Sequence, residues 1–402
     1  MRVVTAPMNS TEATAIQILV GIGTRFETKD KNGISHFLEH MFFKGSKKYP
    51  SFFEITSLFE SLGAAYNAST GYEATKFYIQ TSSKDFKKGY DVLVDLFKNP
   101  LFPKGELEVE RGVILEELKM YLDIPQTLCS IMNQAQTFPS HPLGYDIGGD
   151  ITSVNNINRQ DIIDYFAEHY SPENIIISLA GKNAENYLEQ IKSDFEKLKK
   201  SPIKPYKPFK TDQFKPSAEQ KTKDVDQANF FLSFPAISKL DRRRFAINVL
   251  NFILGGGASS RLFVELREKR GLGYDIGSGT NSYFDVGSFY IYGGVKKDNL
   301  EETLDLAKKE ALKFTQEGPT DEELFRAKGN VRGTIVRQME SSASIADYLT
   351  SSLYWHKKIL TIDEVIKNYE LVTKDEIRSL AQEIFDPKRA IISIVGPKNY
   401  EL

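Results

Sequence analysis

The sequence contains one long internal repeat, and this repeat constrains the fold more than any other feature. Residues 159–181, RQDIIDYFAEHYSPENIIISLAG, match residues 374–396, KDEIRSLAQEIFDPKRAIISIVG, at an offset of 215. Each copy has an amphipathic helical pattern, a turn with proline, and a short apolar strand that ends at glycine. A second pair, residues 106–112 and 323–329, matches at an offset of 217. This nearly constant offset predicts two domains of one fold, because a solenoid would repeat every ~20–50 residues.

The elements expected within each half favour the α+β class. Strand pairs alternate with helices instead of forming strict βαβ units, as in residues 65–82, where two strands turn near Thr70. This alternation predicts a largely antiparallel sheet with helices packed on one face in each domain. The strand expected within residues 13–23 is not followed by the glycine fingerprint of a dinucleotide-binding fold.

Prolines and lysines mark the boundary between the two halves. Residues 200–216 hold four prolines and five lysines without an apolar period. Such a composition is typical of an extended, semi-rigid linker. The predicted organisation is therefore a first domain at residues 1–199, this linker, and a second domain at residues 217–402.

Composition excludes several classes of protein. The net charge is −2, from 52 basic and 54 acidic residues, so neither nucleic acid nor an acidic membrane is an expected partner. The single cysteine, Cys129, excludes an internal disulfide or a cysteine-based metal cluster. We find neither a signal-peptide pattern nor a run of ~18 apolar residues, so we expect a cytoplasmic protein without a membrane span. A leader that had been removed would leave the same pattern.

The segment GISHFLEHMFFKGS, residues 33–46, holds two of the five histidines of the chain. On a helix, His36 and His40 lie on one face, one turn apart, so both imidazoles can reach one ion. Glu39 is close enough to reach a ligand on that ion without binding the ion itself. Two imidazoles and a nearby carboxylate suit zinc. The alternative, a chance meeting of two core or surface histidines, is rare in so histidine-poor a chain.

A third metal ligand is expected from the acidic helix at residues 106–123. Glu110 and Glu117 are seven residues apart and therefore share a face of that helix. Carboxylates on a partly apolar stripe are costly to bury unless a cation faces them. A zinc ion with its histidines would serve as that cation, whereas a solvated helix face remains the ordinary alternative for any one of these glutamates.

These residues carry a resemblance to a known family. The inverted HxxEH order is the inverzincin signature, and the chain resembles the pitrilysin family of zinc metallopeptidases. It is most similar to the two-domain branch that includes mitochondrial processing peptidase and its bacterial homologues. The resemblance implies Glu117, 77 residues after His40, as the third ligand, and Glu110 as a residue that supports a ligand histidine. In the second half, the positions aligned with these two glutamates hold Ala327 and Thr334, so no second metal site is expected.

Two further segments match the substrate-binding parts of the family. YNASTGYEATKFY resembles the edge strand that binds substrate, which places Asn67 and Ala68 in that role. Phe43 matches the aromatic wall for the residue after the cleaved bond, although an ordinary core phenylalanine fits equally well. SSRLFVELREKRGLGYDI resembles the Arg/Tyr motif and places that pair on Arg267 and Tyr274. Only the resemblance selects this pair, since an arginine on a helix followed by a tyrosine on a strand is common.

The resemblance implies a zinc endopeptidase with one Zn²⁺ per chain. His36, His40 and Glu117 would hold the ion in the first domain. Glu39 would act as the general base, and Tyr274 would donate to the substrate or to the developing oxyanion. The expected substrates are unfolded peptides or presequence-like segments, bound as an added β-strand. The alternatives are a non-catalytic scaffold or partner subunit of the same family, and a metal-binding module or zinc hydrolase of other substrates.

The resemblance also implies an assembly. Longer relatives enclose the substrate in a chamber of four such domains, whereas this chain supplies two. Because the metal residues and the Arg/Tyr pair coexist in one chain, a homodimer is the simpler expectation. A heterodimer with a related subunit is the alternative.

Overall fold

The computed structural model describes residues 1–401 and divides the chain into two compact units. Unit 1 consists of residues 1–119, 145–207 and 337–359. Unit 2 consists of residues 120–144, 208–336 and the described residues from 360 onward. Each unit is built around one five-stranded sheet.

The sheet of unit 1 has the order β1-β5-β2-β4-β3, and only β1 and β5 run parallel. Its strands are β1 (Arg2–Pro7), β2 (Ala13–Val20), β3 (Ala65–Thr70), β4 (Thr75–Ser82) and β5 (Ile175–Gly181). The antiparallel strand β3 lies at one end of this order, so one of its edges is not paired within the sheet.

The sheet of unit 2 has the equivalent order, β6-β10-β7-β9-β8, again with one parallel pair, β6 and β10. Its strands are β6 (Ser217–Thr222), β7 (Gln227–Ala236), β8 (Gly273–Ser282), β9 (Gly287–Lys296) and β10 (Ile391–Gly396). The parallel pairs also share their register: Arg2 lies opposite Ile176, and Ser217 lies opposite Ile391. The predicted α+β class with two domains of one fold is therefore confirmed.

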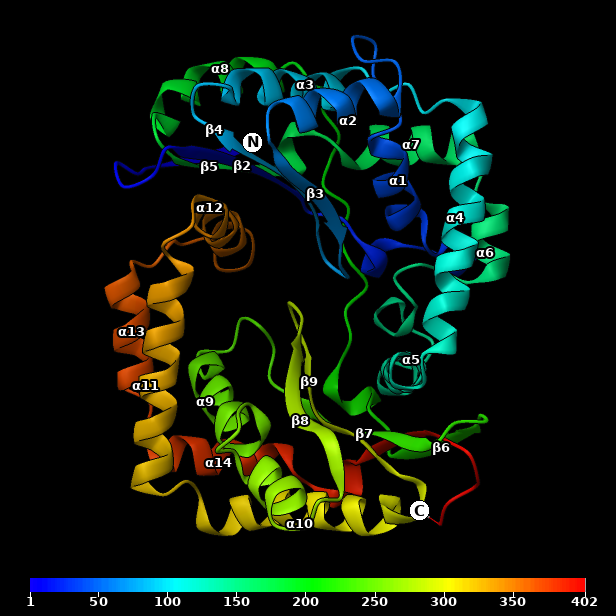
Figure 1. Cartoon of the computed structure of the whole chain (residues 1–402), viewed down its shortest axis with the longest axis vertical. Helices are drawn as coiled ribbons and strands as arrows, with labels where there is room; N and C mark the ends of the chain where they lie inside the picture. The colour runs from blue at the N-terminus through cyan, green and yellow to red at the C-terminus, as the bar shows by residue number, and fades with distance from the viewer. Residues whose placement is uncertain (402) are drawn as a thin grey trace. The chain divides into compact units, whose positions relative to one another are not determined.

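Helices cover one face of each sheet (Figure 1). Their apolar side chains contribute to the core of each unit. The covering helices of unit 1 are α1 (Ile34–Phe42), α2 (Phe52–Ser61), α3 (Phe86–Lys98), α6 (Ile151–Asn156), α7 (Arg159–His169) and α8 (Leu188–Phe195). Those of unit 2 are α9 (Arg244–Gly255), α10 (Leu300–Glu317) and α14 (Lys374–Ile384). Helix α13 (Ile362–Glu370) packs against α9. The chain passes between the units within α4 (Lys104–Asp123) and α11 (Asp321–Gln338).

Short 3₁₀ turns and two π-helical turns complete the described elements. The 3₁₀ turns are η1 (Thr24–Phe26), η2 (Lys29–Lys31), η3 (Pro142–Gly144), η4 (Pro172–Asn174), η5 (Ala184–Tyr187), η6 (Thr211–Gln213), η8 (Lys297–Asn299) and η10 (Pro387–Arg389). The π-helical turns are η7 (Phe263–Glu268) and η9 (Ser352–His356). No helix among residues 1–401 combines the length and the apolar character needed to cross a bilayer.

The opposite face of the first sheet is covered by a helix from the second half of the sequence. This helix, α12 (Ser342–Ser351), belongs to unit 1 (Figure 1). Ala346 packs against Ala15 and Ala180, and these small side chains allow a close approach. Ser178 Oγ donates a hydrogen bond to the carbonyl oxygen of Ala346 at 2.6 Å.

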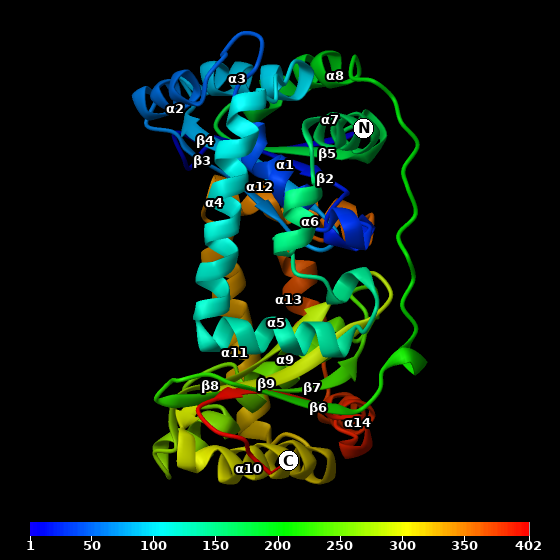
Figure 2. The ribbon, with the colours of Figure 1, turned by 90° about the vertical axis from the view of Figure 1, so that its right-hand side faces the viewer.

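The second sheet receives the reciprocal helix from the first half of the sequence. This helix, α5 (Pro125–Thr137), lies across the sheet of unit 2 (Figure 2). Cys129 is fully buried there, and burial raises the pKa of its thiol to about 12. Asn133 donates to Ser393 Oγ at 3.1 Å and accepts from Ser233 Oγ at 2.5 Å.

The compact units therefore do not follow the predicted sequence boundaries of 1–199 and 217–402. Helix α5 from the first half of the sequence belongs to unit 2, and α12 from the second half belongs to unit 1. These helices cover the second face of each sheet. The predicted linker, residues 200–216, contains one regular element, η6. Its aromatic side chains are anchored: Tyr206 lies 4.1 Å from the Arg25 guanidinium, and Phe209 is buried against Phe138.

Candidate metal centre

Helix α1 presents both predicted histidine ligands on one face. Phe37, Leu38 and Met41 on the opposite side are fully buried in the core of unit 1, which fixes the rotation of the helix. The imidazole rings of His36 and His40 consequently lie side by side, with their centroids 4.6 Å apart.

Glu117 from α4 completes a group of three donors. Its Oε2 lies 3.7 Å from Nε2 of His36 and 3.6 Å from Nε2 of His40. One donor atom from each residue fits within 4.8 Å of the other two. Ligand atoms of a tetrahedral zinc ion, each about 2.0–2.1 Å from the metal, are about 3.4 Å apart. The distances and the nitrogen and oxygen donors therefore fit a zinc ion.

Glu110 fixes the orientation of His40. Its Oε2 lies 3.0 Å from Nδ1 of His40, and its Oε1 lies 2.5 Å from Nζ of Lys44. Burial would raise the pKa of Glu110, but the hydrogen bonds from His40 and Lys44 outweigh burial and lower it. An ionised Glu110 accepts the Nδ1 proton of His40, which leaves the Nε2 lone pair directed towards Glu117.

His36 is held in its neutral form. Burial lowers its pKa to about 4, and the neighbouring His40 acts in the same direction, whereas Glu117 opposes them. A neutral imidazole is the form that binds a metal ion. His36 is therefore ready to act as a ligand at neutral pH.

Glu39 lies beside this group and is held by the end of strand β3. The hydroxyl of Thr70 donates to Oε2 of Glu39 at 2.5 Å, and the backbone N–H of Thr70 donates to the same carboxylate. Burial raises the pKa of Glu39, although the two Thr70 hydrogen bonds oppose this shift. A carboxylate with a raised pKa accepts and returns a proton more readily near neutral pH.

The unpaired edge of β3 ends at this carboxylate. The N–H of Gly71 pairs with the carbonyl of Ala74 across the hairpin, whereas the N–H of Ala68 donates to its neighbour Asn67 Oδ1 at 2.9 Å. Alternate backbone groups of β3, at Ala68 and Thr70, therefore point away from β4. Phe43 is half-buried, with the Tyr66 ring 5.9 Å away, so both interpretations of this residue remain compatible with its position.

Three residues of the site were not found from the sequence. Lys44 could have been found, because it follows His40 by four positions and therefore shares its face. Thr70 lies in the predicted edge strand but was not linked to Glu39. Glu27 has no local signal: its buried carboxylate accepts backbone N–H groups of Gly33 and Ser35 at the start of α1.

Arg267 and Tyr274 lie in unit 2 and contact each other. The guanidinium of Arg267, on η7, lies 4.1 Å from the centre of the Tyr274 ring, and Nη1 donates to the Tyr274 carbonyl at 3.0 Å. The Tyr274 side chain is 76% exposed. Within residues 1–401, the group of His36, His40 and Glu117 is the only candidate metal-binding set, and it belongs entirely to unit 1.

Comparison with known proteins places this chain in one family. A profile of the insulinase family, peptidase family M16, matches residues 2–150. A second profile, described as the peptidase M16 inactive domain, matches residues 156–331. The chain is 32% identical over 405 residues to a protein of Streptomyces coelicolor named an uncharacterized zinc protease, covering 99% of this chain and 88% of that relative. A Bacillus subtilis protein of the same description is 31% identical over 400 residues, covering 99% and 96%.

Solved structures agree in fold. A crystal structure described as the peptidase M16 inactive domain from Pseudomonas fluorescens has a TM-score of 0.91 at 21% identity, covering 100% of this chain and 96% of that chain. A protease from Helicobacter pylori has a TM-score of 0.90 at 23% identity, covering 98% and 96%. The sequence relatives match over nearly the full length of the chain, and the two profiles match successive parts of it. The chain therefore belongs to peptidase family M16, the pitrilysin family, as a two-domain member.

Proposed function

We propose that this protein is a zinc-dependent endopeptidase that cleaves unfolded peptides. The observation that carries this proposal is the convergence of His36, His40 and Glu117 directly beside Glu39, at the end of the unpaired edge of β3. When bound, zinc supplies Lewis acidity, which lowers the pKa of a water ligand and polarises a carbonyl. The relatives named as zinc proteases support this choice of metal.

Glu39 is the general base in this proposal. Its buried carboxylate takes a proton from the attacking water and later passes that proton to the leaving amine. Thr70 holds the carboxylate in place through its hydroxyl and its backbone N–H. Glu110 keeps the Nδ1 proton on His40, so that Nε2 remains a ligand.

The substrate is bound along β3. Backbone groups at Ala68 point outward and can pair with an extended peptide, which places the peptide beside Glu39. Such pairing reads the peptide backbone, so it requires an unfolded chain and gives loose sequence specificity. Asn67 and Phe43 are the side chains that we assign to contacts with the flanking residues of the peptide.

Arg267 and Tyr274 complete the proposed machinery. The exposed phenol of Tyr274 can donate to the substrate or to a developing oxyanion. Arg267 stacks on its ring and so restricts the orientation of the tyrosine. We propose a homodimer as the working assembly, with a heterodimer as the alternative. Solution mass and the activity of the purified chain alone distinguish them, because a heterodimer would be inert until another chain is added.

The decisive experiment replaces Glu39 by glutamine. Glu39→Gln keeps the shape of the side chain and leaves the three metal donors untouched, so bound zinc should stay at the wild-type level. Cleavage of a quenched peptide should fall by about 10²–10⁴-fold, the usual contribution of a general base. Glu116→Gln, at an exposed position next to Glu117 on α4, is the matched control and should keep full activity.

Two outcomes would change the proposal. Full peptidase activity in Glu39→Gln would exclude this mechanism. A wild-type protein that binds one zinc ion but cleaves none of a broad set of unfolded peptides would favour the non-catalytic alternative, a scaffold or partner subunit.

A further inference from the structure

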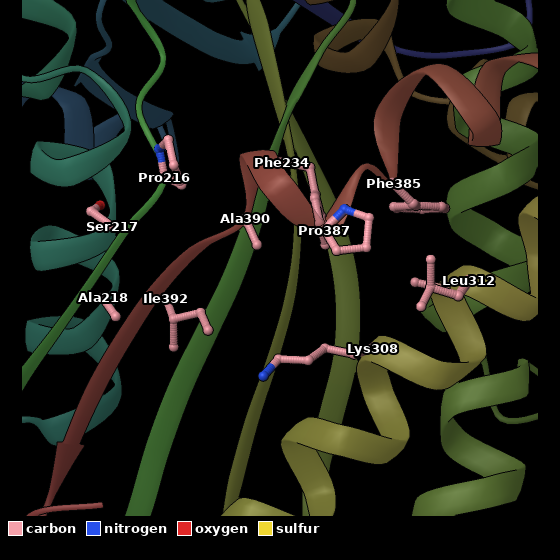
Figure 3. Close-up of a pocket in the computed structure, with 11 residues that line it drawn as sticks. Pro216, Ser217, Ala218, Phe234, Lys308, Leu312, Phe385, Pro387, Ala390 and Ile392 are labelled. Carbon is pink, nitrogen blue, oxygen red and sulfur yellow. The ribbon is translucent and has the colours of Figure 1, made fainter. Parts of the chain in front are cut away.

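Unit 2 contains an apolar pocket on the helix-covered side of its sheet (Figure 3). Its volume is about 430 Å³, within the usual range of small-molecule sites. Buried side chains of Phe234, Ala311, Phe385 and Ile392 line it. Its remaining lining residues are Pro216, Ser217, Ala218, Lys308, Leu312, Pro387 and Ala390.

In unit 1, side chains fill the space that corresponds to this pocket. In unit 1, Phe97 of α3 packs against Tyr170 at 6.0 Å and against Phe195 of α8 at 5.5 Å, measured between ring centroids. Phe97 and Phe195 are fully buried, and Tyr170 is 3% exposed. Three aromatic rings therefore fill the space between the helices and the sheet.

The internal repeat aligns the residues of the pocket with the residues of the corresponding region in unit 1. The buried positions of α3 and α10 have the same spacing at an offset of 214, which aligns Phe97 with Ala311 and Val94 with Lys308. The strand registers align Val3 with Ala218. Large side chains of unit 1 are thus replaced by alanines in unit 2, and these replacements open the pocket.

An apolar space of this size is costly to leave without contacts, because its lining loses dispersion energy and exposes apolar surface. The corresponding region of unit 1 indicates that an apolar group of aromatic or acyl character fits here.

One charged group distinguishes this pocket from the corresponding region of unit 1. Lys308 is the only charged residue among the eleven that line it, and it stands where unit 1 has the buried Val94. Figure 3 shows its side chain extending from α10 along the pocket. Its amino group lies 3.9 Å from Oδ1 of Asp305, whose side chain is 81% exposed, so this ion pair is weak.

We infer that this pocket binds an amphipathic monoanion, such as a medium-chain fatty acid. The apolar tail lies on Phe234, Phe385 and Ile392, and the carboxylate pairs with the amino group of Lys308. This site is in unit 2 and does not depend on the proposed peptidase activity, because none of its lining residues takes part in that proposal.

The experiment titrates the full chain with decanoate, and separately with decanol, by isothermal titration calorimetry below their aggregation concentrations. Decanoate should bind once per chain, and decanol at least fivefold more weakly, since it lacks the charge. Ala311→Phe restores the ring found in unit 1 and should weaken decanoate binding at least tenfold. The melting temperature of the Ala311→Phe protein should equal or exceed that of the wild type, because the new ring fills the pocket.

Two lysine variants separate the charge from the apolar contacts. Lys308→Met should bind decanoate and decanol with equal affinity, whereas Lys309→Met, at an exposed neighbouring position, should keep the preference for the acid. If Ala311→Phe does not fold, Ala390→Ile, which introduces the residue aligned in unit 1, replaces it. Absence of saturable decanoate binding, or unchanged binding in a folded Ala311→Phe protein, would overturn the inference.

Discussion

At the scale of single residues, Lys44 decides the charge of the candidate metal centre. Glu110 and Glu117 bring two carboxylates to the two histidines, and Glu110 is only 5% exposed. The Lys44 amino group, 2.5 Å from Oε1 of Glu110, neutralises one of these carboxylates without competing for the donor atoms. The orientation of His40 therefore depends on a residue that does not belong to the HxxEH motif.

Removing this amino group should weaken metal binding. We expect Lys44→Met to raise the dissociation constant for zinc by about 10–100-fold, the usual effect of losing an outer partner of a metal ligand. Competition with a chromogenic chelator measures this change. Lys47→Met, three residues further on and exposed, is the control. Equal zinc affinities in the two variants would show that Glu110 orients His40 without help from Lys44.

His169 should make the stability of unit 1 depend on pH. It lies under the Tyr165 ring, and burial lowers its pKa to about 4, with Glu168 opposing this shift. Its ordinary pKa is about 6.5, so between pH 6.5 and 4 the unfolded chain binds a proton that the folded unit does not. The stabilisation is therefore complete above pH 6.5 and is lost as the pH falls towards 4, by on the order of 3 kcal/mol.

His169→Gln tests this assignment because glutamine does not titrate. Urea unfolding of the metal-free protein at several pH values should show a shallower loss of stability between pH 6.5 and 4 in the variant than in the wild type. Parallel curves for the two proteins would exclude His169 as the titrating group.

At the scale of elements, α1 shows what the sequence could and could not predict. The spacing of His36 and His40 predicted both the helix and the shared face, because this information lies within one turn. The start of the helix could not be predicted in the same way. Its N-cap is Gly33, which has no capping side chain, and the buried Glu27 carboxylate takes this role instead.

The same distinction holds for the other elements of the site. The edge strand at Asn67 and the acidic helix that carries Glu117 were predicted from local patterns and the resemblance. The link between Glu39 and Thr70 depends on how α1 packs against β3, which no local pattern contains. Likewise, an amphipathic pattern predicts that α5 and α12 are buried, but not against which sheet.

Loss of the Glu27 carboxylate should loosen the start of α1. Glu27 accepts from Asn32 at 2.9 Å, from the Gly33 N–H at 2.7 Å and from the Ser35 N–H at 2.9 Å. Glu27→Gln keeps one oxygen but places an amide N–H₂ against these donors, which should destabilise unit 1 by about 2–3 kcal/mol. Since His36 follows Ser35 directly, zinc affinity should fall as well.

A matched variant distinguishes the loss of the Glu27 cap from the loss of any carboxylate near the start of a helix. Glu54→Gln removes an exposed carboxylate from the first turn of α2 and should change stability by less than about 1 kcal/mol. Urea unfolding and chelator competition measure both quantities. A Glu27→Gln protein with wild-type stability and zinc affinity would show that the cap does not position the metal ligands.

At the scale of the whole molecule, the two exchanged helices make each unit depend on both halves of the sequence. The sheet of unit 1 buries Ala15 and Ala180 under α12, whose sequence follows that sheet by about 160 residues. The sheet of unit 2 buries Phe231 and Val395 under α5, in contact with Cys129. Neither half of the chain therefore contains all the surfaces that its own sheet requires.

This exchange predicts that the two halves of the chain fold together and not separately. Residues 1–207 and 208–402, produced alone, should each expose the uncovered face of a sheet and an unpaired amphipathic helix, and should aggregate or bind a hydrophobic dye. Produced together, they should form a stable one-to-one complex, because α5 and α12 can dock as they do in the intact chain. Size-exclusion chromatography with mass determination detects this complex.

The packing of α12 supplies the control. Ala346 is 1% exposed and fits against two alanines, so Ala346→Phe should prevent docking through overpacking. The co-produced halves with this substitution should not form the complex, whereas Asp363→Ala, at an exposed position of α13, should leave it intact. Two halves that are separately soluble, compact and cooperative in unfolding would show that the exchanged helices are not required, and that the sequence boundary at residues 200–216 already separates two independent folding units.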